Sequence, residues 1–311
     1  MNSYDVAVIG GSAAGLSAAL VLSRARRTVL VVDAGTPRNA PATHMHGYLS
    51  RDGLPPRELV EIGRAEVKAY GGELLDGTVT EVLPNGHTGF WLLLSDGRRV
   101  AARRVLVATG LRDELPDVEG LTERWARDVL HCPYCHGWEV RDQQLGVLGG
   151  SPEAVRYALI VRQWSHDVVY FTPPGVLNAR ERGELVARAI GVVEGDVRRV
   201  VVTDDRISGV ELDDGRVVPR DVVFVPPRFV PNNGLLARLD CDLDAQGWVS
   251  VDPVGRTSVR GVWAAGNVVD PRAQVITAAG AGSATAIAIN ADLVDDDVRL
   301  AVQAFNHGYG A

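Results

Sequence analysis

Apolar and polar residues alternate in blocks over the N-terminal part of the 311-residue chain. The pattern predicts a buried strand at 6–9, a glycine turn at 10–15, a helix at 14–24 and a strand at 28–32 that ends in Asp33. A helix N-terminus presents free N–H groups and a positive dipole end to a pyrophosphate, and glycine lets that ligand approach the backbone. An acid after the second strand accepts hydrogen bonds from a ribose hydroxyl. The unit therefore predicts dinucleotide binding.

The glycine turn departs from the usual fingerprint at one position. It is G-G-S-A-A-G, with Ser12 where a second glycine is usual. A turn of this kind also occurs in α/β cores that hold no ligand. The strand, helix and acid around it favour a bound dinucleotide over that alternative.

Two later segments complete the fold begun at the N-terminus. Residues 104–110 form a strand that runs into a glycine turn. Residues 261–294 give a strand, a turn at Gly266 and Asn267, and a helix from about Thr277. That helix is rich in alanine and glycine, so it must pack closely against a sheet or a cofactor. The first domain is therefore discontinuous.

The middle of the chain repeats the first unit. Residues 144–175 again give a strand, a G-G-S-P-E-A turn, a helix and a strand, which indicates a duplicated nucleotide-binding architecture. The copy is degenerate, because Ser151 replaces a glycine and Pro152 follows it. The residues after its second strand, 170–174, offer neither an acid for a ribose nor an arginine pair for a 2′-phosphate.

Residues beyond this copy do not clearly restore a nucleotide site. Arg180 and Arg182 are able to bind a phosphate, but a solvated helix face is the preferred interpretation. Residues 192–226 have short alternating strands with turns at 204–205 and 213–215. We expect them to form a meander that completes the second domain.

Composition narrows the class of protein. Hydrophobic residues make up 46% and charged residues 23%, as in ordinary globular proteins. The net charge of -7 and the scattered arginines argue against nucleic-acid binding. Residues 4–22 are apolar enough for a signal peptide, but they lack a basic start and contain glycines, and no segment is apolar enough to span a bilayer. With only three cysteines, we expect a cytoplasmic protein and no disulfide scaffold.

Two of the cysteines form the C-x-x-C of HCPYCHGWEV, residues 131–140. A metal site, a structural disulfide and a redox couple are the alternatives. Metal binding needs a second ligand pair, and the flanking histidines are badly spaced to converge on one ion, so no metal is expected. Cys241, far away, is interpreted as a buried structural thiol. A redox pair is favoured because Cys132 and Cys135 close a small ring, Pro133 restricts the backbone, and a helix starting there lowers the thiol pKa.

These motifs together resemble the low-molecular-weight thioredoxin reductase family over essentially the whole chain. The residues that carry the resemblance are the G-G-S-A-A-G unit, VATG at 107–110, C-P-Y-C, and GVWAAGNVVD…QVITAAG near the end. The resemblance implies an α/β fold with two Rossmann-like domains, FAD as cofactor, and a homodimer. We expect a discontinuous FAD domain at 1–115 and 246–311, and an inserted NAD(P)-like domain at 116–245 that carries the C-x-x-C.

The same resemblance implies a set of FAD-binding residues. Gly10, Gly15 and Asp33 would hold the ADP half, and Gly266 and Asn267 the ribityl and pyrophosphate. The family usually has aspartate where this chain has Asn267. The N-terminus of the last helix would stabilise negative charge on the flavin. The full expected set is Gly10, Ser12, Ala13, Ala14, Gly15, Asp33, Ala34, Arg38, Asn39, His44, His46, Ala108, Thr109, Gly110, Gly266, Asn267, Gln274, Val275 and Thr277.

A narrower resemblance rests on the stretch 33–53, on C-P-Y-C-H and on the missing nicotinamide residues. It is to the dithiol oxidases of the gliotoxin and holomycin type, which close a disulfide in a small natural product and pass electrons to oxygen. Cys135 would then face the flavin, and Cys132 would exchange with the substrate. His136 stands where the ordinary reductase has an acid, and we expect it to transfer a proton. His44, His46 and His131 are secondary candidates, whereas His87, His166 and His307 are interpreted as surface residues.

The sequence thus predicts an FAD-dependent dithiol oxidase of antibiotic biosynthesis, with a small-molecule dithiol as substrate, O2 as acceptor and H2O2 as product. One alternative is a thioredoxin-disulfide reductase supplied by NADPH or by ferredoxin. An alternative of another class is a flavin-binding redox sensor without turnover. The absence of a working second nucleotide site counts against NADPH, and the intact C-x-x-C-H counts against the sensor.

Overall fold

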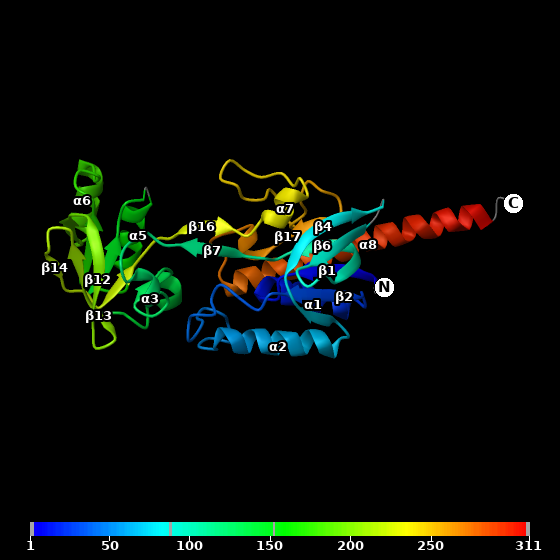
Figure 1. Ribbon diagram of the computed structural model, residues 1–311, viewed down its shortest axis with the longest axis horizontal. Helices are drawn as coiled ribbons and strands as arrows, with labels where there is room; N and C mark the ends of the chain where they lie inside the picture. Colours follow the sequence, from blue (N-terminus) through cyan, green and yellow to red (C-terminus); the bar gives the residue numbers. More distant parts are fainter. Residues whose placement is uncertain (1–2, 87–88, 152, 309–311) are drawn as a thin grey trace. The chain divides into compact units, whose positions relative to one another are not determined.

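The computed structural model describes residues 3–86, 89–151 and 153–308 (Figure 1). The chain forms two compact units. Unit 1 comprises the residues up to Ala40, Tyr48–Arg112 and the residues from Val230 onward, and unit 2 comprises Pro41–Gly47 and Asp113–Phe229. Each unit is built on its own mainly parallel sheet, so each is described separately.

Unit 1 contains a sheet of strand order β3-β2-β1-β6-β5-β4, in which β17 also pairs with β6. Strands β1, β2, β3 and β17 run parallel to their neighbours, whereas β4 and β5 form an antiparallel hairpin. The elements are β1 (Ser3–Ile9), α1 (Ala13–Arg24), β2 (Val29–Asp33), α2 (Pro56–Ala69), β3 (Glu73–Asp76), β4 (Val79–Asn85), β5 (Gly89–Leu94), β6 (Arg99–Val107), α7 (Gly234–Arg238), β17 (Val262–Ala264), the 3₁₀ turn η1 (Gly266–Val268) and α8 (Val275–Gly308).

The central strands are apolar because both faces of the sheet are covered. Val6, Val8 and Leu106 lie in one core cluster together with buried residues of α1 and α8. The predicted close packing of the small-residue helix is confirmed, and its neighbour is α1. A methyl group at Gly282 of α8 would lie 2.0 Å from the Ala14 carbonyl oxygen of α1, so glycine is needed there.

A buried ionic cluster fastens α8 to the sheet. The Arg104 guanidinium on β6 donates to Asp292 at 2.6 Å and to Asp296 at 2.5 Å. Burial works against the charged form of Asp296, but hydrogen bonds from Arg104 and Arg299 outweigh it and lower the pKa of Asp296 to about 2. Because an unpaired buried charge is costly, this cluster fixes which face of α8 meets the sheet.

Unit 2 contains a second parallel sheet, of order β11-β10-β9-β15-β8. Its first three strands have the order of β3-β2-β1, so the predicted duplication is present. The elements are α3 (Leu121–Arg124), β8 (Val129–Leu130), α4 (Pro133–His136), β9 (Leu145–Leu148), α5 (Ala154–Val161), β10 (Val168–Thr172), α6 (Ala179–Ala187), β11 (Gly191–Glu194), β12 (Val197–Thr203), β13 (Arg206–Leu212), β14 (Val217–Val218) and β15 (Val222–Phe224). Short strands β7 (Leu111–Glu114) and β16 (Arg228–Pro231) pair with each other.

The predicted meander at 192–226 is correct only in part. Strands β12, β13 and β14 form a three-stranded antiparallel sheet, as expected. Strands β11 and β15 instead belong to the parallel sheet. β15 is buried along its whole length, which suits a central parallel strand.

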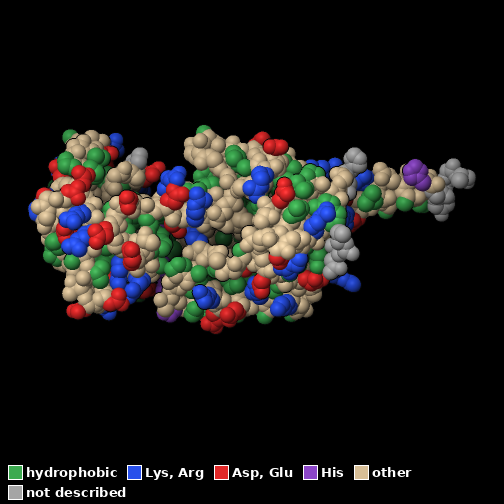
Figure 2. Space-filling view, in the orientation of Figure 1, with side chains coloured by type: hydrophobic (Ala, Val, Ile, Leu, Met, Phe, Trp, Pro, Cys, Tyr) green, Lys and Arg blue, Asp and Glu red, His purple; other side chains and the backbone are tan. Residues whose placement is uncertain are grey.

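The expected domain limits of 115/116 and 245/246 differ from the limits of the units, which fall at 112/113 and 229/230. Residues after Val230 belong to unit 1 because Leu235 and Leu236 of α7 are buried in its core, beside Val79 and Val82 of β4. In Figure 2, acidic and basic side chains are interspersed over the visible face, in line with the scattered arginines. No helix in the described part of the chain is both long and apolar enough to cross a bilayer.

Candidate functional site

Three turns meet at the carboxyl ends of parallel strands in unit 1. The Ala108 N–H donates to the Ile9 carbonyl at 2.8 Å, and the Ala265 N–H donates to the Val107 carbonyl at 3.1 Å. These bonds bring the ends of β1, β6 and β17 together. Open α/β sheets bind ligands at such an edge, where the strand order reverses.

The turn after β1 has no room for side chains at its glycines. A methyl group at Gly10 would lie 2.3 Å from the Ala108 carbonyl oxygen, and one at Gly15 would lie 1.9 Å from the Gly10 carbonyl oxygen. Gly266 has a positive φ of 80°, and a methyl group there would lie 2.8 Å from Ala14. The result is a cradle of bare backbone, which is what a pyrophosphate needs.

Helix α1 begins in this cradle. Ser12 is its N-cap, without a capping hydrogen bond from its side chain, and Ala13, Ala14 and Gly15 form the first turn. The Gly11 N–H donates to Asp33 Oδ1 at 3.0 Å, which fixes the carboxylate at the end of β2. Asp33 keeps a second oxygen, Oδ2, 3.6 Å from Arg64 of α2. Sequence reasoning missed Arg64, since no motif links it to Asp33.

The turn after β6 is locked by another residue that sequence reasoning missed. Asn232 donates from its side chain to the Thr109 carbonyl at 3.0 Å, and Thr109 Oγ1 donates to the Asn232 carbonyl at 2.7 Å. The Asn232 N–H also donates to the Gly110 carbonyl at 3.0 Å. These three hydrogen bonds therefore fix the backbone of the turn at 108–110, which lies beside the turn after β1.

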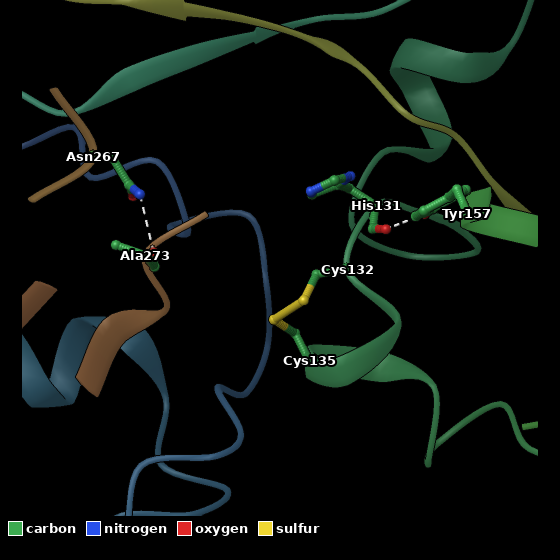
Figure 3. The surroundings of a disulfide bond; sticks show 6 residues. All are labelled: His131, Cys132, Cys135, Tyr157, Asn267 and Ala273. Atoms are coloured by element: carbon green, nitrogen blue, oxygen red, sulfur yellow. Dashed lines mark hydrogen bonds between the residues drawn. A yellow bond between two sulfur atoms is a disulfide. The ribbon is translucent and has the colours of Figure 1, made fainter. Parts of the chain in front are cut away.

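The neutral side chain at Asn267 has a local explanation. Its amide nitrogen donates to the carbonyls of Asp270 at 2.8 Å and Ala273 at 3.0 Å (Figure 3). An aspartate cannot donate to these oxygens, so asparagine suits this turn. This turn leads to α8. Gln274 directly precedes the helix and its carbonyl accepts from the Ala278 N–H at 2.8 Å, and Val275 and Thr277 lie in the first turn of the helix.

The loop after β2 divides between the units. Ala34, Arg38 and Asn39 belong to unit 1, with the rest of the expected FAD residues. His44 and His46 lie in the segment Pro41–Gly47, which belongs to unit 2. His44 is exposed and His46 is half-buried. His46 therefore belongs to the same compact unit as Cys132 and Cys135.

Cys132 and Cys135 form a disulfide with a Cα–Cα distance of 5.2 Å (Figure 3). Cys132 is the N-cap of α4, and Pro133 is its first residue. The N–H groups of Cys135 and His136 both donate to the Cys132 carbonyl at 3.1 Å. The pair therefore opens a short helix of four residues.

An aromatic cluster supports the residue before the disulfide. The buried Tyr157 hydroxyl donates to the His131 carbonyl, and burial raises the pKa of Tyr157 well above its ordinary value (Figure 3). The His131 ring stacks on Tyr157 at 6.2 Å and meets Phe229 edge-on at 5.1 Å. His131 therefore anchors the chain that leads into Cys132.

His136 follows Cys135 and is half-buried. Burial lowers the pKa of His136, Glu139 opposes that shift through its negative charge, and His46 adds to it through its positive charge. His46 Nε2 lies 3.5 Å from Glu139 Oε1. A lowered pKa keeps His136 neutral near pH 7, ready to accept a proton.

Two exposed aromatic residues flank the disulfide. Tyr134 and Trp138 are each 65% exposed. Tyr134 packs edge-on against Trp164 at 5.4 Å, and the Arg141 guanidinium lies 4.1 Å above the Trp138 ring. Sequence reasoning did not single out this pair, although its signal is the spacing Y-C-H-G-W. The two rings provide an apolar surface beside the redox sulfurs.

The second glycine turn, after β9, is filled from within. The phenol oxygen of Tyr170 packs against it, since a methyl group at Gly149 would lie 2.5 Å from that oxygen. Burial raises the pKa of Tyr170, and the nearby Gly150 N–H opposes the shift. Strand β10 ends at Thr172, so a threonine stands at the position of the acid in the first unit.

The remaining candidates lie away from this chemistry. His166 and His307 are exposed, as expected, whereas His87 lies outside the described residues. Cys241 is buried in unit 1, where its thiol donates to Thr257 at 3.5 Å and burial raises its pKa. Within the described ranges, no three or more His, Cys, Asp or Glu side chains gather in a way that would hold a metal ion.

With this geometry established, comparison with known proteins identifies the family. The model of the pyridine nucleotide-disulphide oxidoreductases matches residues 4–283. The chain belongs to this family. Thioredoxin reductase tcpT of Claviceps purpurea is 31% identical over 279 residues, covering 86% of this chain and 87% of tcpT. Thioredoxin reductase sirT of Leptosphaeria maculans is 29% identical over 314 residues, covering 95% and 96%. The crystal structure of HlmI is 56% identical, with a TM-score of 0.96 over 99% of this chain and 98% of HlmI.

Membership of this oxidoreductase family confirms the predicted fold class, with its two Rossmann-type units, and the predicted resemblance to thioredoxin reductases. The protein is an enzyme and a flavoprotein, and its cofactor is FAD. The bare cradle around Gly10 and Gly15, the N-terminus of α1 and the fixed carboxylate of Asp33 fit the ADP half of FAD. Unit 1 thus has the residues that this cofactor requires.

Proposed function

We propose that the protein is an FAD-dependent dithiol oxidase, which forms an intramolecular disulfide in a small natural-product dithiol with O2 as acceptor and H2O2 as product. The redox group of the chain is the Cys132–Cys135 disulfide. When bound, FAD supplies the two-electron carrier that connects this pair to oxygen. The residues that we assign to the cofactor remain those of the three turns in unit 1.

The chain's own residues act on the thiols. One substrate thiol gives its proton to neutral His136 and attacks Cys132, and a mixed disulfide forms as the Cys132–Cys135 bond breaks. The second substrate thiol then attacks the mixed disulfide, which releases the cyclic product and leaves both cysteines reduced. The substrate thus loses two electrons and two protons. Tyr134 and Trp138 offer the apolar surface on which a small molecule would rest.

The observation that carries the proposal is the filled second turn. A reductase supplied by NADPH needs free backbone N–H groups at this turn and a partner for the ribose. Here the phenol oxygen of Tyr170 packs against Gly149 and fills the turn, and Thr172 stands where an acid would be. The 56% identity to HlmI supports the same assignment through the resemblance to the holomycin type.

A homodimer is part of the proposal. The end of α8 extends past the sheet of unit 1 (Figure 1). It exposes Val294, Val298, Val302 and Phe305, at spacings that place them along one helix face. We expect a second copy to cover this stripe. Light scattering should give twice the mass of one chain, and Val298→Asp together with Val302→Asp should give monomers; a monomeric unaltered protein would contradict the dimer.

The direction of electron flow is tested by anaerobic mixing. The purified yellow protein is mixed either with dithiothreitol, as a model dithiol, or with NADPH, and the flavin absorbance is followed. We expect bleaching by the dithiol and peroxide when air is admitted. Rapid bleaching by low concentrations of NADPH would instead identify a thioredoxin-disulfide reductase, the function named for the relatives sirT and tcpT. Reduction by ferredoxin is tested in the same way, and a flavin that none of these reduces would indicate a sensor.

Cys132→Ser separates cofactor binding from thiol chemistry. Because Cys132 lies in unit 2 and the FAD cradle lies in unit 1, the variant should keep its flavin and lose dithiol oxidation. Cys241→Ser is the matched control, since its thiol is buried in unit 1 away from the redox pair. Dithiol oxidation at the normal rate by Cys132→Ser would overturn the assignment.

A further inference from the structure

Three titratable side chains belong to the surroundings of the disulfide. His136 and His46 are both half-buried, and Glu139 is exposed. Glu139 comes three residues after His136, in the turn that follows α4, and its Oε1 lies 3.5 Å from His46 Nε2. The imidazole that would accept a proton is thus followed along the chain by a carboxylate that pairs with a second imidazole.

The three groups come from two separate stretches of the chain. His136 and Glu139 belong to the C-x-x-C stretch, whereas His46 comes from Pro41–Gly47, between β2 and α2. Both stretches belong to unit 2, so the ion pair is part of one compact body. The segment leaves unit 1, brings one imidazole to Glu139, and returns to unit 1 at Tyr48.

We propose that Glu139, paired with His46, is a positioning residue for proton transfer from the substrate thiol through His136. The inference rests on the proposed function. A dithiol that reduces the Cys132–Cys135 bond releases a proton at each attack, and His136 receives the first one. The negative charge of Glu139 stabilises the imidazolium that forms, and the imidazolium then gives the proton to water, so that His136 is neutral again for the second attack. The two electrons that the substrate loses remain on the sulfurs of Cys132 and Cys135.

The charges around His136 predict opposite effects for two variants. Two charged groups act on the pKa of His136: Glu139, three residues later in the chain, and His46, from the segment Pro41–Gly47. Glu139→Gln removes a charge that raises the pKa of His136, so that pKa should fall. His46→Asn removes a charge that lowers it and also releases Glu139 from its pair, so the pKa should rise. If the two variants only disturbed the fold, they would not move the pKa of His136 in opposite directions.

Two measurements test this prediction. The first is an NMR titration of histidine-labelled oxidised protein, with His136→Asn used to identify the His136 signal. The second is the rate at which dithiothreitol reduces the disulfide, measured against pH. The rate should rise with pH, and the pH at which it rises should be lower in Glu139→Gln and higher in His46→Asn than in the unaltered protein. Glu123→Gln, an exposed glutamate of α3 in the same unit, should leave that pH and the His136 titration unchanged.

The outcomes separate the two proposals. If neither variant moves the His136 titration, or if both move it in one direction, the role of Glu139 is wrong whatever the enzyme oxidises. If the titrations move as expected but dithiols do not reduce the protein, the arrangement of charges stands and the dithiol oxidase is wrong. The NMR titration needs no turnover, so it remains decisive in both cases.

Discussion

The two glycine turns follow equivalent strands and are completed differently. The Gly10 N–H donates to the Val32 carbonyl at 2.9 Å, and the Gly149 N–H donates to the Phe171 carbonyl at 2.7 Å. The side chain that lies against each turn differs. The Gly11 N–H donates to the Asp33 carboxylate at 3.0 Å, whereas a methyl group at Gly149 would lie 2.5 Å from the Tyr170 phenol oxygen. One turn thus orients an acid, and a tyrosine of the core fills the other.

Strand register shows which positions account for the difference. Val31 pairs with Val8, two residues before Gly10, and Tyr170 pairs with Val147, two residues before Gly149. Val31 of the first turn is therefore replaced by Tyr170 in the second. By the same register, Thr172 stands in the place of Asp33 and Ala154 in the place of Gly15. A larger side chain beneath the turn thus fills it with no change of fold.

The largest effect is expected from Gly15→Ala in the first turn. The added methyl group would lie 1.9 Å from the Gly10 carbonyl oxygen, so the cradle must open. Overpacking costs about 1–3 kcal/mol or more. Since each ~1.4 kcal/mol is a tenfold change in the affinity for FAD, the FAD content should fall about tenfold or further. Flavin absorbance per chain after gel filtration measures it. Gly183→Ala in α6, where nothing lies within 4 Å, should keep full flavin content; equal content in both variants would contradict the prediction.

A smaller loss is expected from Asp33→Asn. The variant keeps an oxygen for the Gly11 N–H but loses the charge that strengthens bonds to the ribose and to Arg64. Hydrogen bonds to charged groups contribute about 1.5–3 kcal/mol, so the Kd for FAD should rise about tenfold or more. Titration of the apoprotein with FAD measures the Kd. Asp76→Asn, which removes the other carboxylate bound by Arg64, is the control, and its Kd should stay near that of the unaltered protein.

Tyr170→Phe tests the filling of the second turn. Without the phenol oxygen, the buried side chain leaves a gap against Gly149, and a small gap of this kind costs about 1 kcal/mol. The thermal unfolding of unit 2 should shift down by a few degrees while FAD content stays unchanged. Tyr134→Phe, whose ring is exposed, should unfold normally. Unchanged stability of Tyr170→Phe would show that the phenol oxygen contributes little to the packing of the turn.

The smallest effect is expected when the first turn's residues are placed in the second. Tyr170→Val with Thr172→Asp removes the phenol that packs against Gly149 and supplies an acid for a ribose. We expect NADH to bind weakly, with a Kd of roughly 1 mM, or about 4 kcal/mol of binding free energy, as measured by NADH fluorescence. Thr172→Asp alone should not bind, because Tyr170 still fills the turn. Absence of binding by the double variant would place the block elsewhere in the turn.

Much of the fold follows from local patterns in the chain. The strand, turn and helix at 6–24 form within a few residues of their expected limits, since apolar runs and glycine turns are local signals. The limit after residue 229 was missed because nothing in the sequence shows that α7 packs on the first sheet. β11 and β15 were assigned to a meander because short apolar strands do not reveal whether their partners are parallel.

The site was predicted unevenly for the same reason. Gly10, Gly15 and Asp33 belong to one local motif, so they could be found together. Arg64 and Asn232 act through contacts across long stretches of chain, and no spacing reveals them. The pairing of His46 with Glu139 likewise depends on a loop that leaves one unit and packs in the other.

By itself, the sequence determined that the chain holds two dinucleotide-type units, a C-x-x-C and a second turn that departs from the usual fingerprint, because neighbouring residues encode each of them. Only the tertiary structure decided how that second turn is closed, since the tyrosine that fills it comes from the next strand. It alone also decided that His136 has a carboxylate and a second imidazole near it. Contacts between distant residues depend on packing, and packing is a property of the folded chain.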